Sequence, residues 1–347
     1  MKGRVEQLDG LRGVFAVLII AHHHNAFPES IFYNNFFVVN AGLFVDFFFV
    51  LSGYVIAMNY MDRVNNFQEL FSFLKKRFIR LYPLLVFTEM VFLLFNLIGD
   101  NTPFKNVPMN TAYYLNTVTD TLTFMGSTPV FGSWIGLNYP SWSISSEMIS
   151  YWIFGLVLVT LPKRKLHAFF IIILLSVAFI VNFGEYMLAY DFGFIRGVLC
   201  FCAGIFTFIF LKNFHLKTNW AEIPFLFVLI SSMYFVHHWE LNLARLIFPI
   251  LFAIGIVIFT NSTGILAKWL NSKPIQFLGK ISYSIYLNHA IVLIGLNVIL
   301  FRVLHLPVEE WMILISLLTS ISLTILYSTF TYKYIEMGVG NYLKRML

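Results

Sequence analysis

Arg12 and His23 are the first residues whose types and spacing could support chemistry. They are eleven positions apart, almost three helical turns, so both lie on one helix face, about 16 Å apart along the axis. Arginine binds phosphate, and a neutral imidazole is a natural general base for a hydroxyl nucleophile. Coenzyme A, with phosphates at one end and a thioester on a slender arm, would fit between them. The pair therefore suits acyl transfer. The alternative is an arginine that anchors the helix and a histidine that is only a buried polar group.

His23 stands between two further histidines, which raises the question of a metal site. On a helix, His22 and His24 point about 100° to either side of His23. Three consecutive imidazoles therefore cannot converge on one ion, and we expect no metal site. We assign the catalytic role to His23, because it alone shares a helix face with Arg12.

A second basic pair lies in the segment KKRFIRLYPLL. Arg77 and Arg80 are three residues apart, so they are neighbours on a helix face. The planar guanidinium matches phosphate oxygens in a bidentate way. We expect both arginines to bind the donor together with Arg12. The alternative is a basic stop at the inner membrane surface, which any membrane protein needs.

Polar side chains inside apolar segments indicate functional sites, because burying them in lipid is costly. Glu147 and Arg196 enter the membrane to similar depths from the outer side, so we expect them to pair. Ser143 shares a helix face with Glu147. Asp46 lies deeper, where it either orients His23 or binds an arginine.

The segment SYSIYLNH holds a further polar face. Ser282, Tyr286 and His289 fall on one side of a helix. Counted from Lys280, His289 is about 13 Å deep, close to the level of His23. Two imidazoles at one depth predict a shared cavity.

The composition places these residues in a membrane. Of 347 residues, 59% are apolar and 12% charged, whereas an ordinary soluble domain has about 25% charged residues. Lipid must cover so much apolar surface. The net charge of +6 comes from short basic loops and does not indicate nucleic acid. We predict an all-α bundle of about ten membrane-spanning helices. The predicted spans are 11–28, 36–59, 81–99, 142–161, 166–183, 192–211, 222–238, 243–260, 281–304 and 311–332.

The basic residues also predict the orientation. With the N-terminus inside, every inner loop is rich in Lys and Arg, whereas the outer loops hold Lys105 alone. Both termini are then cytoplasmic, and the protein lies in the plasma (inner) membrane. The outer segment 100–141 includes a semi-apolar stretch, 111–125. We interpret it as an interfacial or re-entrant element that lines a cavity, with a full span as the alternative.

Five segments in order resemble the acyltransferase-3 family of membrane-bound acyltransferases, which includes bacterial O-acetyltransferases of surface polysaccharides such as O-antigen. They are LDGLRGVFAVLIIAHH, VDFFFVLSGYVI, KKRFIRLYPLL, PSWSISSEMISYW and GKISYSIYLNH, and the resemblance runs from residue 7 to about residue 336. The family's arginine, ten residues, histidine pattern falls on Arg12 and His23. Its Arg-x-x-Arg pattern, used near the acyl-CoA, falls on Arg77 and Arg80. The resemblance implies that His23 is essential and that cytoplasmic acetyl-CoA is the donor for an acceptor on the far side.

We therefore expect one domain over residues 1–347, without a fused extracellular domain. The expected reaction moves an acyl group, acetyl or longer, to a hydroxyl of a surface or lipid-linked polysaccharide at the outer face. Transfer is either direct or through an acyl-histidine. The expected partners are acyl-CoA, a saccharide acceptor and membrane lipid. The competing hypothesis is a transporter or flippase of lipid-linked saccharides, although the sequence lacks the paired repeats common in transporters.

Overall fold

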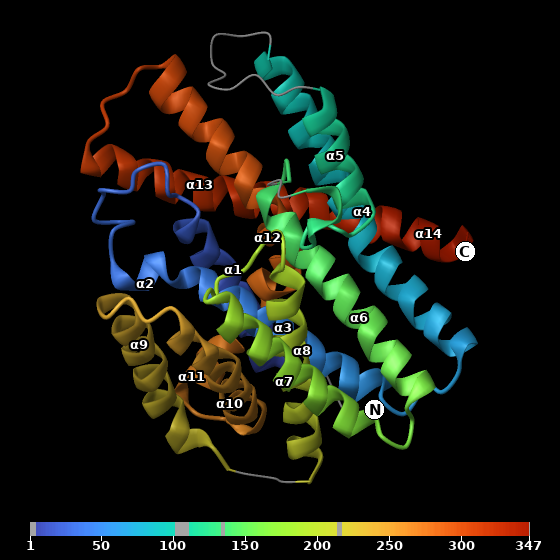
Figure 1. Ribbon diagram of the computed structural model, residues 1–347. Coiled ribbons are helices and arrows are strands. Elements are labelled where there is room, and N and C mark those ends of the chain that lie inside the picture. The colour runs from blue at the N-terminus through green and yellow to red at the C-terminus, as the bar shows by residue number, and fades with distance from the viewer. Residues whose placement is uncertain (1–4, 101–110, 133–135, 214–216, 347) are drawn as a thin grey trace.

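The chain forms an all-α bundle, as predicted (Figure 1). The computed structural model describes residues 5–100, 111–132, 136–213 and 217–346. Within these residues, nine segments are long and apolar enough to cross a membrane. They are Phe36–Tyr60, Phe67–Ile98, Tyr139–Thr160, Lys165–Phe183, Gly193–Lys212, Asn219–His238, Leu243–Asn261, Lys273–Val303 and Glu310–Met346. The remaining predicted span corresponds to α1 (Glu6–His22), whose 17 residues are at the short end of membrane-crossing lengths.

Short helices, 3₁₀ turns and two π-helical stretches supplement the long helices. The α-helices after α1 are α2 (Phe36–Val39), α3 (Phe44–Tyr60), α4 (Phe67–Asp100), α5 (Thr111–Leu122), α6 (Trp142–Thr160), α7 (Lys165–Phe183), α8 (Gly193–Asn213), α9 (Glu222–His238), α10 (Phe248–Asn261), α11 (Ile265–Leu270), α12 (Lys273–Asn297), α13 (Glu310–Thr331) and α14 (Gly340–Met346). The π-helical stretches are η6 (Val298–Val303), which continues α12, and η7 (Tyr332–Val339), which joins α13 to α14. Such π-helical turns are frequent at functional sites.

The helix α4 begins earlier than predicted. The sequence suggested a span at 81–99 after a basic loop, but the helix starts at Phe67. Asn66 caps the first turn, because its Oδ1 atom accepts a hydrogen bond from the Glu69 N–H at 2.9 Å. No proline or glycine follows before Pro83. The predicted basic loop is therefore the first part of a continuous helix.

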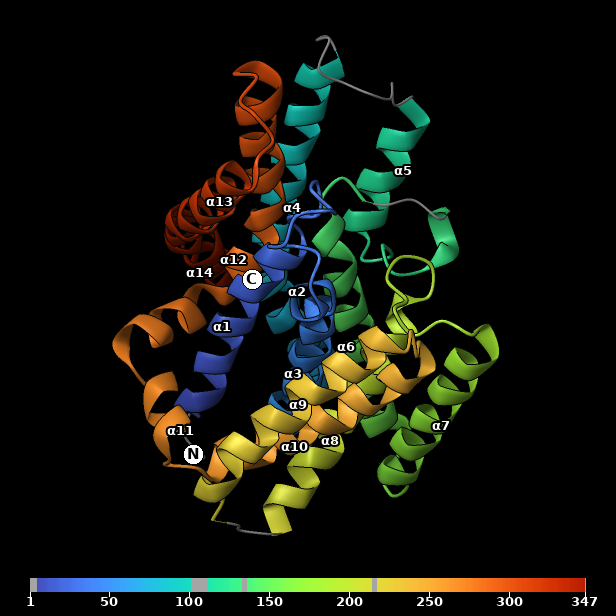
Figure 2. The ribbon, with the colours of Figure 1, turned by 90° about the vertical axis from the view of Figure 1, so that its left-hand side faces the viewer.

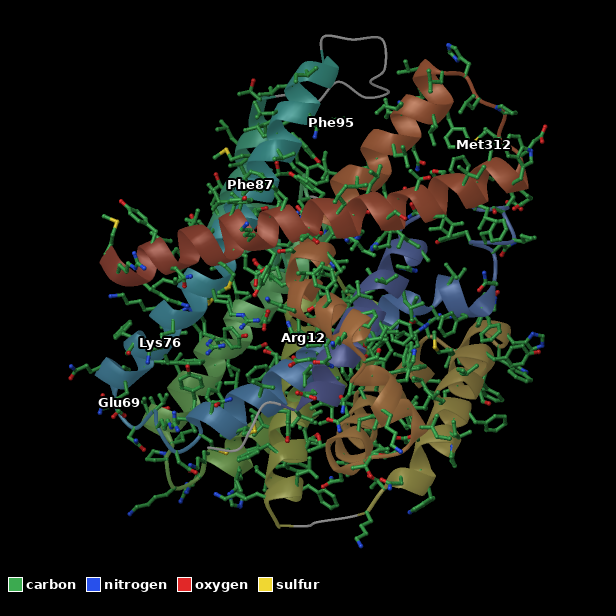
Figure 3. All side chains as sticks on the ribbon, turned by 180° about the vertical axis from the view of Figure 1, so that it is seen from behind. Arg12, Glu69, Lys76, Phe87, Phe95 and Met312 are labelled. Atoms are coloured by element: carbon green, nitrogen blue, oxygen red, sulfur yellow. The ribbon has the colours of Figure 1, made fainter. Side chains whose placement is uncertain are left out.

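This helix also passes Pro83 without ending. Proline lacks an N–H donor and weakens the preceding turn. At this turn the Tyr283 hydroxyl of α12 donates to the carbonyl oxygen of Leu81 at 2.7 Å, which adds a partner from outside the helix. Figure 3 shows the continuous helix, with Lys76 toward one end and Phe95 toward the other.

Glycines bring two pairs of helices into backbone contact near the centre of the bundle (Figure 2). A Cβ atom on Gly13 of α1 would lie 2.5 Å from the backbone nitrogen of Gly279 on α12. A Cβ atom on Gly279 would lie 2.2 Å from the carbonyl oxygen of Asp9. Between α3 and α8, a Cβ atom on Gly53 would lie 1.9 Å from the carbonyl oxygen of Phe201. Small residues of this kind let membrane helices approach closely.

The predicted outer segment contains a short helix and not a full span. α5 (Thr111–Leu122) has 12 residues, about 18 Å, whereas a bilayer core is about 30 Å thick. The helix packs against α4 and buries Asp120 and Thr121. Other parts of the predicted segment, at 101–110 and 133–135, lie outside the described residues.

The α3–α8 contact leads to a stability prediction. Gly53→Ala should lower the midpoint of thermal unfolding in detergent, because the new methyl group would overlap a backbone carbonyl. Overpacking of this kind costs about 1–3 kcal/mol. Gly295→Ala on α12 is the matched control, since no atom lies within 4 Å of its added Cβ. Equal midpoints for the two variants would contradict the close contact.

Candidate active site

Many of the predicted site residues line one cavity, which we call the arginine pocket. Its volume is about 150 Å³, and residues of α1, α3, α4, α6 and α12 form its walls. The predicted residues among them are Arg12, Arg77, Arg80, Ser143, Glu147, Ser282 and Tyr286. A cavity of about 150 Å³ can hold a molecule the size of benzene. The pocket therefore has room for a slim chain but not for a nucleotide.

The three arginines of the pocket keep hydrogen-bonding capacity for an anion. Arg12, near the centre of the view in Figure 3, makes an ion pair with Asp9 at 3.5 Å. Nη2 of Arg77 donates to the Tyr60 hydroxyl at 2.9 Å, and its buried Nε has no partner. Arg80 is exposed beside them. Because each guanidinium has five N–H donors, these contacts leave donors free for phosphate.

Glu147 faces the same pocket, where hydroxyl groups hold it. It accepts hydrogen bonds from Ser52 Oγ at 2.7 Å and from the Tyr151 hydroxyl. The predicted pairing of Glu147 with Arg196 is wrong, because Arg196 binds Asp46. That prediction rested on equal depth in the membrane, but depth does not determine which neighbouring helix a side chain faces.

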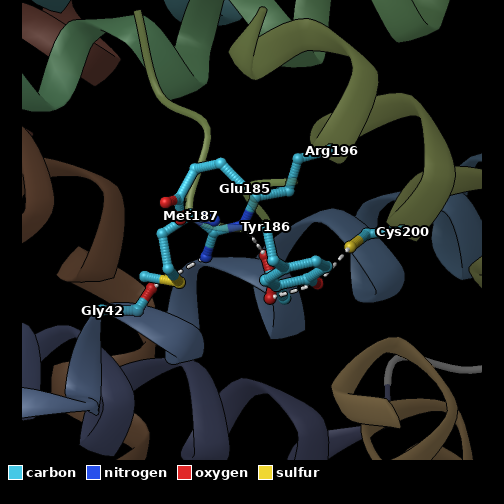
Figure 4. Close-up of polar contacts among 7 residues, drawn as sticks. Gly42, Glu185, Tyr186, Met187, Arg196 and Cys200 are labelled. Atoms are coloured by element: carbon cyan, nitrogen blue, oxygen red, sulfur yellow. Dashed lines mark hydrogen bonds and ion pairs between the residues drawn. The ribbon is translucent and has the colours of Figure 1, made fainter. Parts of the chain in front are cut away.

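Asp46 and Arg196 form a closed, buried ion pair. Figure 4 shows Arg196, Tyr186 and Gly42 of this network. Their side chains are 0% and 2% exposed, and Arg196 Nε lies 2.7 Å from Asp46 Oδ1. The second carboxylate oxygen accepts from the Tyr186 hydroxyl at 2.8 Å, and Arg196 Nη2 donates to the Gly42 carbonyl at 3.2 Å. Of the two predicted roles for Asp46, binding an arginine is confirmed. The network joins α3 to α8 and to the loop before α8.

His23 and His289 are in direct contact, as their equal predicted depth suggested. His289 Nε2 lies 2.9 Å from His23 Nδ1, and His289 Nδ1 lies 2.7 Å from the Tyr286 carbonyl oxygen. A carbonyl only accepts, so Nδ1 of His289 must carry the proton, and its Nε2 is the acceptor in the neutral ring. His23 Nδ1, also 3.1 Å from the Ile19 carbonyl, is then the donor. The hydrogen-bond network thus assigns the free lone pair of His23 to Nε2.

The two neighbouring histidines point elsewhere, but not for the predicted reason: α1 ends at His22 and not at residue 28, so His23 and His24 lie beyond the regular helix. His22 Nδ1 lies 3.0 Å from the Val38 carbonyl oxygen, and His24 Nε2 lies 3.2 Å from Ser316 Oγ on α13. Within the described parts of the chain, no three His, Cys, Asp or Glu side chains gather in a way that could hold a metal ion.

Aromatic rings separate the arginine pocket from the two histidines. Phe48 and Tyr286 line the pocket with ring centroids 5.9 Å apart, and the Tyr286 ring lies 5.9 Å from that of His289. Tyr139 packs against the ring of His23 at 4.7 Å. Neither Phe48 nor Tyr139 was predicted as a site residue. Only the richness of the outer segment in aromatic and polar residues could have indicated Tyr139.

The described helices form a membrane-embedded bundle whose candidate site is compatible with acyl transfer. A model of the acyltransferase domain family matches residues 5–332, nearly the whole chain, so the chain belongs to the acyltransferase-3 family. No solved structure matches the chain.

Curated relatives agree with this assignment. O-acetyltransferase OatA of Staphylococcus aureus (strain NCTC 8325) is 28% identical over 356 residues, which cover 95% of this chain and 56% of that protein. The strain COL protein matches equally well. Protein 2 in picA locus of Rhizobium radiobacter is 31% identical over 164 residues, or 41% of this chain and 76% of that protein. The chain thus spans about half the length of the OatA proteins.

The Asp46–Arg196 pair leads to a prediction about coupling. Asp46→Asn and Arg196→Gln should each destabilise the protein by about 3–5 kcal/mol, because each leaves the other charge buried and unpaired. The double variant should lose much less than the sum of the two. Unfolding free energies of the four proteins in detergent measure this coupling. Additive losses would show that the two residues act independently.

Proposed function

We propose that the protein is an O-acyltransferase that moves an acyl group, most simply acetyl, from acyl-CoA to a saccharide hydroxyl. The observation that supports this best is the oriented histidine pair beside a pocket walled by three arginines. The family supports acyl transfer, and the name of the Staphylococcus aureus relative supports acetyl as the group and oxygen as the acceptor atom.

The donor would bind with its phosphates at the mouth of the arginine pocket and its arm inside. The cavity of about 150 Å³ suits the thin arm and a small acyl group, and the arginines suit the phosphates. The rings of Phe48 and Tyr286, which pack edge to face, would have to move apart to let the arm place the thioester near His23. Basic inner loops support a cytoplasmic donor and an inner-membrane location with both termini inside.

In the proposed reaction, Nε2 of His23 accepts the proton of the acceptor hydroxyl while that oxygen attacks the thioester carbonyl. The tetrahedral intermediate then collapses, the carbon–sulfur bond breaks, and the thiolate takes the proton from His23. The products are an ester and the free thiol. His289 orients His23 through the Nδ1 hydrogen bond, as a second group orients the base in other acyl-transfer sites. In the covalent alternative, Nε2 attacks the thioester first.

The acceptor in this proposal is a hydroxyl of a surface or lipid-linked polysaccharide at the outer face. A transporter or flippase of such saccharides is the rival function. Consumption of acyl-CoA by the purified protein, with an ester as the second product, would separate the two. Saccharide movement without acyl-CoA consumption would favour the rival.

His23 is the residue whose loss should matter most. His23→Ala should lower acyl transfer by about 10²–10⁴-fold, the usual cost of removing a general base. His22→Ala and His24→Ala are controls, because their rings bond Val38 and Ser316 and not His289. Transfer of labelled acetyl is measured, with acyl-CoA binding tested in parallel. Near-normal transfer by His23→Ala together with an inactive neighbour variant would show that another imidazole acts.

The arginine pocket leads to a separate prediction about the donor. Arg80→Ala should raise KM for acyl-CoA by about tenfold or more, since a hydrogen bond to a charged group contributes about 1.5–3 kcal/mol, while KM for the acceptor changes little. Lys76→Ala removes a nearby exposed positive charge that does not line the pocket, so it is the matched control. The kinetic constants of both variants are compared with the wild type. An unchanged donor KM in a folded Arg80→Ala protein would remove Arg80 from the donor site.

A further inference from the structure

A second group of buried polar atoms lies outside the arginine pocket and has not been assigned a role. Glu89 of α4, Asp120 of α5 and Asn138 are 1%, 3% and 0% exposed. Both carboxyl oxygens of Glu89, Oδ1 of Asp120 and Oδ1 of Asn138 have no partner within normal hydrogen-bond geometry. The Thr121 hydroxyl and the backbone N–H of Asn138 lie close enough to act as weak hydrogen-bond donors to Glu89, and the Asp120 carboxyl is also nearby. We call Glu89, Asp120 and Asn138 the acceptor-oxygen cluster.

The orientation of Asn138 shows that its free oxygen is not a misplaced nitrogen. Its Nδ2 donates to Thr88 Oγ1 at 3.0 Å and to the Leu287 carbonyl oxygen at 3.1 Å. Because a carbonyl cannot donate, the atom that faces Leu287 must be the amide nitrogen. The side-chain oxygen is therefore left without a donor.

The cluster adjoins the histidine pair through the chain itself. Asn138 is followed directly by Tyr139, whose ring lies 4.7 Å from that of His23. Leu287, which Asn138 binds, lies two residues before His289 on α12. Asn138 is thus held next to the proposed base, while Glu89 lies on α4 nine residues beyond Arg80 of the donor pocket.

The chemistry of the cluster defines what could bind there. The Asp120 and Asn138 oxygens are acceptors, and no Lys, Arg or His of the described residues forms an ion pair with Glu89 or Asp120. Burial raises the pKa of Asp120 to about 6, so it is still mostly ionised at neutral pH and acts only as an acceptor. Buried acceptors without donors are rare in folded proteins. A ligand with several hydroxyl donors and no negative charge would satisfy them.

We propose that Glu89, Asp120 and Asn138 bind hydroxyl groups of an uncharged saccharide acceptor and hold its reacting hydroxyl beside Nε2 of His23. This subsite rests on the proposed acyltransferase function and adds the acceptor's chemical class. A polyanionic saccharide is disfavoured, because the ionised Asp120 carboxylate would repel it.

If these residues bind the acceptor, substituting them should keep or raise thermal stability and should lower acyl transfer. Glu89→Gln and Asp120→Asn replace a buried carboxyl group by an amide of the same shape and break no ion pair, so the midpoint of thermal unfolding should stay the same or rise. Acyl-CoA binding by the purified variants should remain within about twofold of the wild type. Acetyl ester on the envelope polysaccharides, released with alkali and measured by mass spectrometry, should fall at least about tenfold. For this measurement each variant replaces the gene in its own organism.

Two comparisons make the result decisive. Asp62→Asn changes an exposed carboxylate just after α3, which makes only long surface ion pairs with Lys165 and Lys212, and should keep both stability and ester content. Asp46→Asn breaks a closed pair and should lower the unfolding midpoint, which is the signature of a structural carboxylate. A similar drop in Glu89→Gln, or a parallel loss of acyl-CoA binding, would assign the cluster a structural role. Unchanged ester content in stable variants would exclude the subsite.

The same experiment separates the subsite from the function on which it rests. If the wild-type gene adds no acetyl ester relative to a deletion strain, the proposed function is wrong. If the wild type adds the ester and both cluster variants do so equally, only the subsite is wrong.

Discussion

The contact between Gly13 and Gly279 is the constraint on which the candidate site depends. Because neither residue has a Cβ atom, the backbones of α1 and α12 touch, and an added Cβ on Gly13 would lie only 2.5 Å from the Gly279 nitrogen. His23 follows Gly13 by ten residues, and His289 follows Gly279 by the same number. Two parallel helices packed in register at the glycines therefore meet again ten residues later. There the imidazoles lie 2.9 Å apart.

The buried charges of the bundle fall into two kinds, and the difference has a physical basis. Lipid offers no hydrogen bonds, so a structural charge must be satisfied within the protein. Asp46 meets this demand through Arg196 and Tyr186, and both of its oxygens are bonded. Glu89 does not, since neither of its oxygens has a partner within normal hydrogen-bond geometry. Closed networks hold helices together, whereas an open one leaves bonding capacity for a ligand.

Features that depend on composition and on spacing along one helix could be predicted from the sequence. Contacts between side chains of different helices could not. Spacing along single helices correctly grouped Arg77 with Arg80 on one wall of the pocket. Apolar runs predicted the all-α bundle. The region before residue 81 is basic and was therefore predicted as a loop, although it forms the first part of α4. The partner of Arg196 could not be predicted, because it depends on which helices pack together. The position of Tyr139 beside His23 depends on the path of an irregular segment. Such a segment has no hydrophobic periodicity from which its path could be predicted.

The histidine pair also limits how charge can be handled during transfer. A carboxylate partner would stabilise the imidazolium formed when a histidine takes a proton. His289 offers only a neutral lone pair, because its own proton is bound to the Tyr286 carbonyl oxygen. Asp46 is already paired, and Glu147 faces the arginine pocket. An acyl group on Nε2 of His23 would leave either that ring or His289 positively charged without a counter-ion beside it. Direct transfer forms an imidazolium at His23 as well, but only until the proton passes to the departing thiolate, so the charge is short-lived on that path.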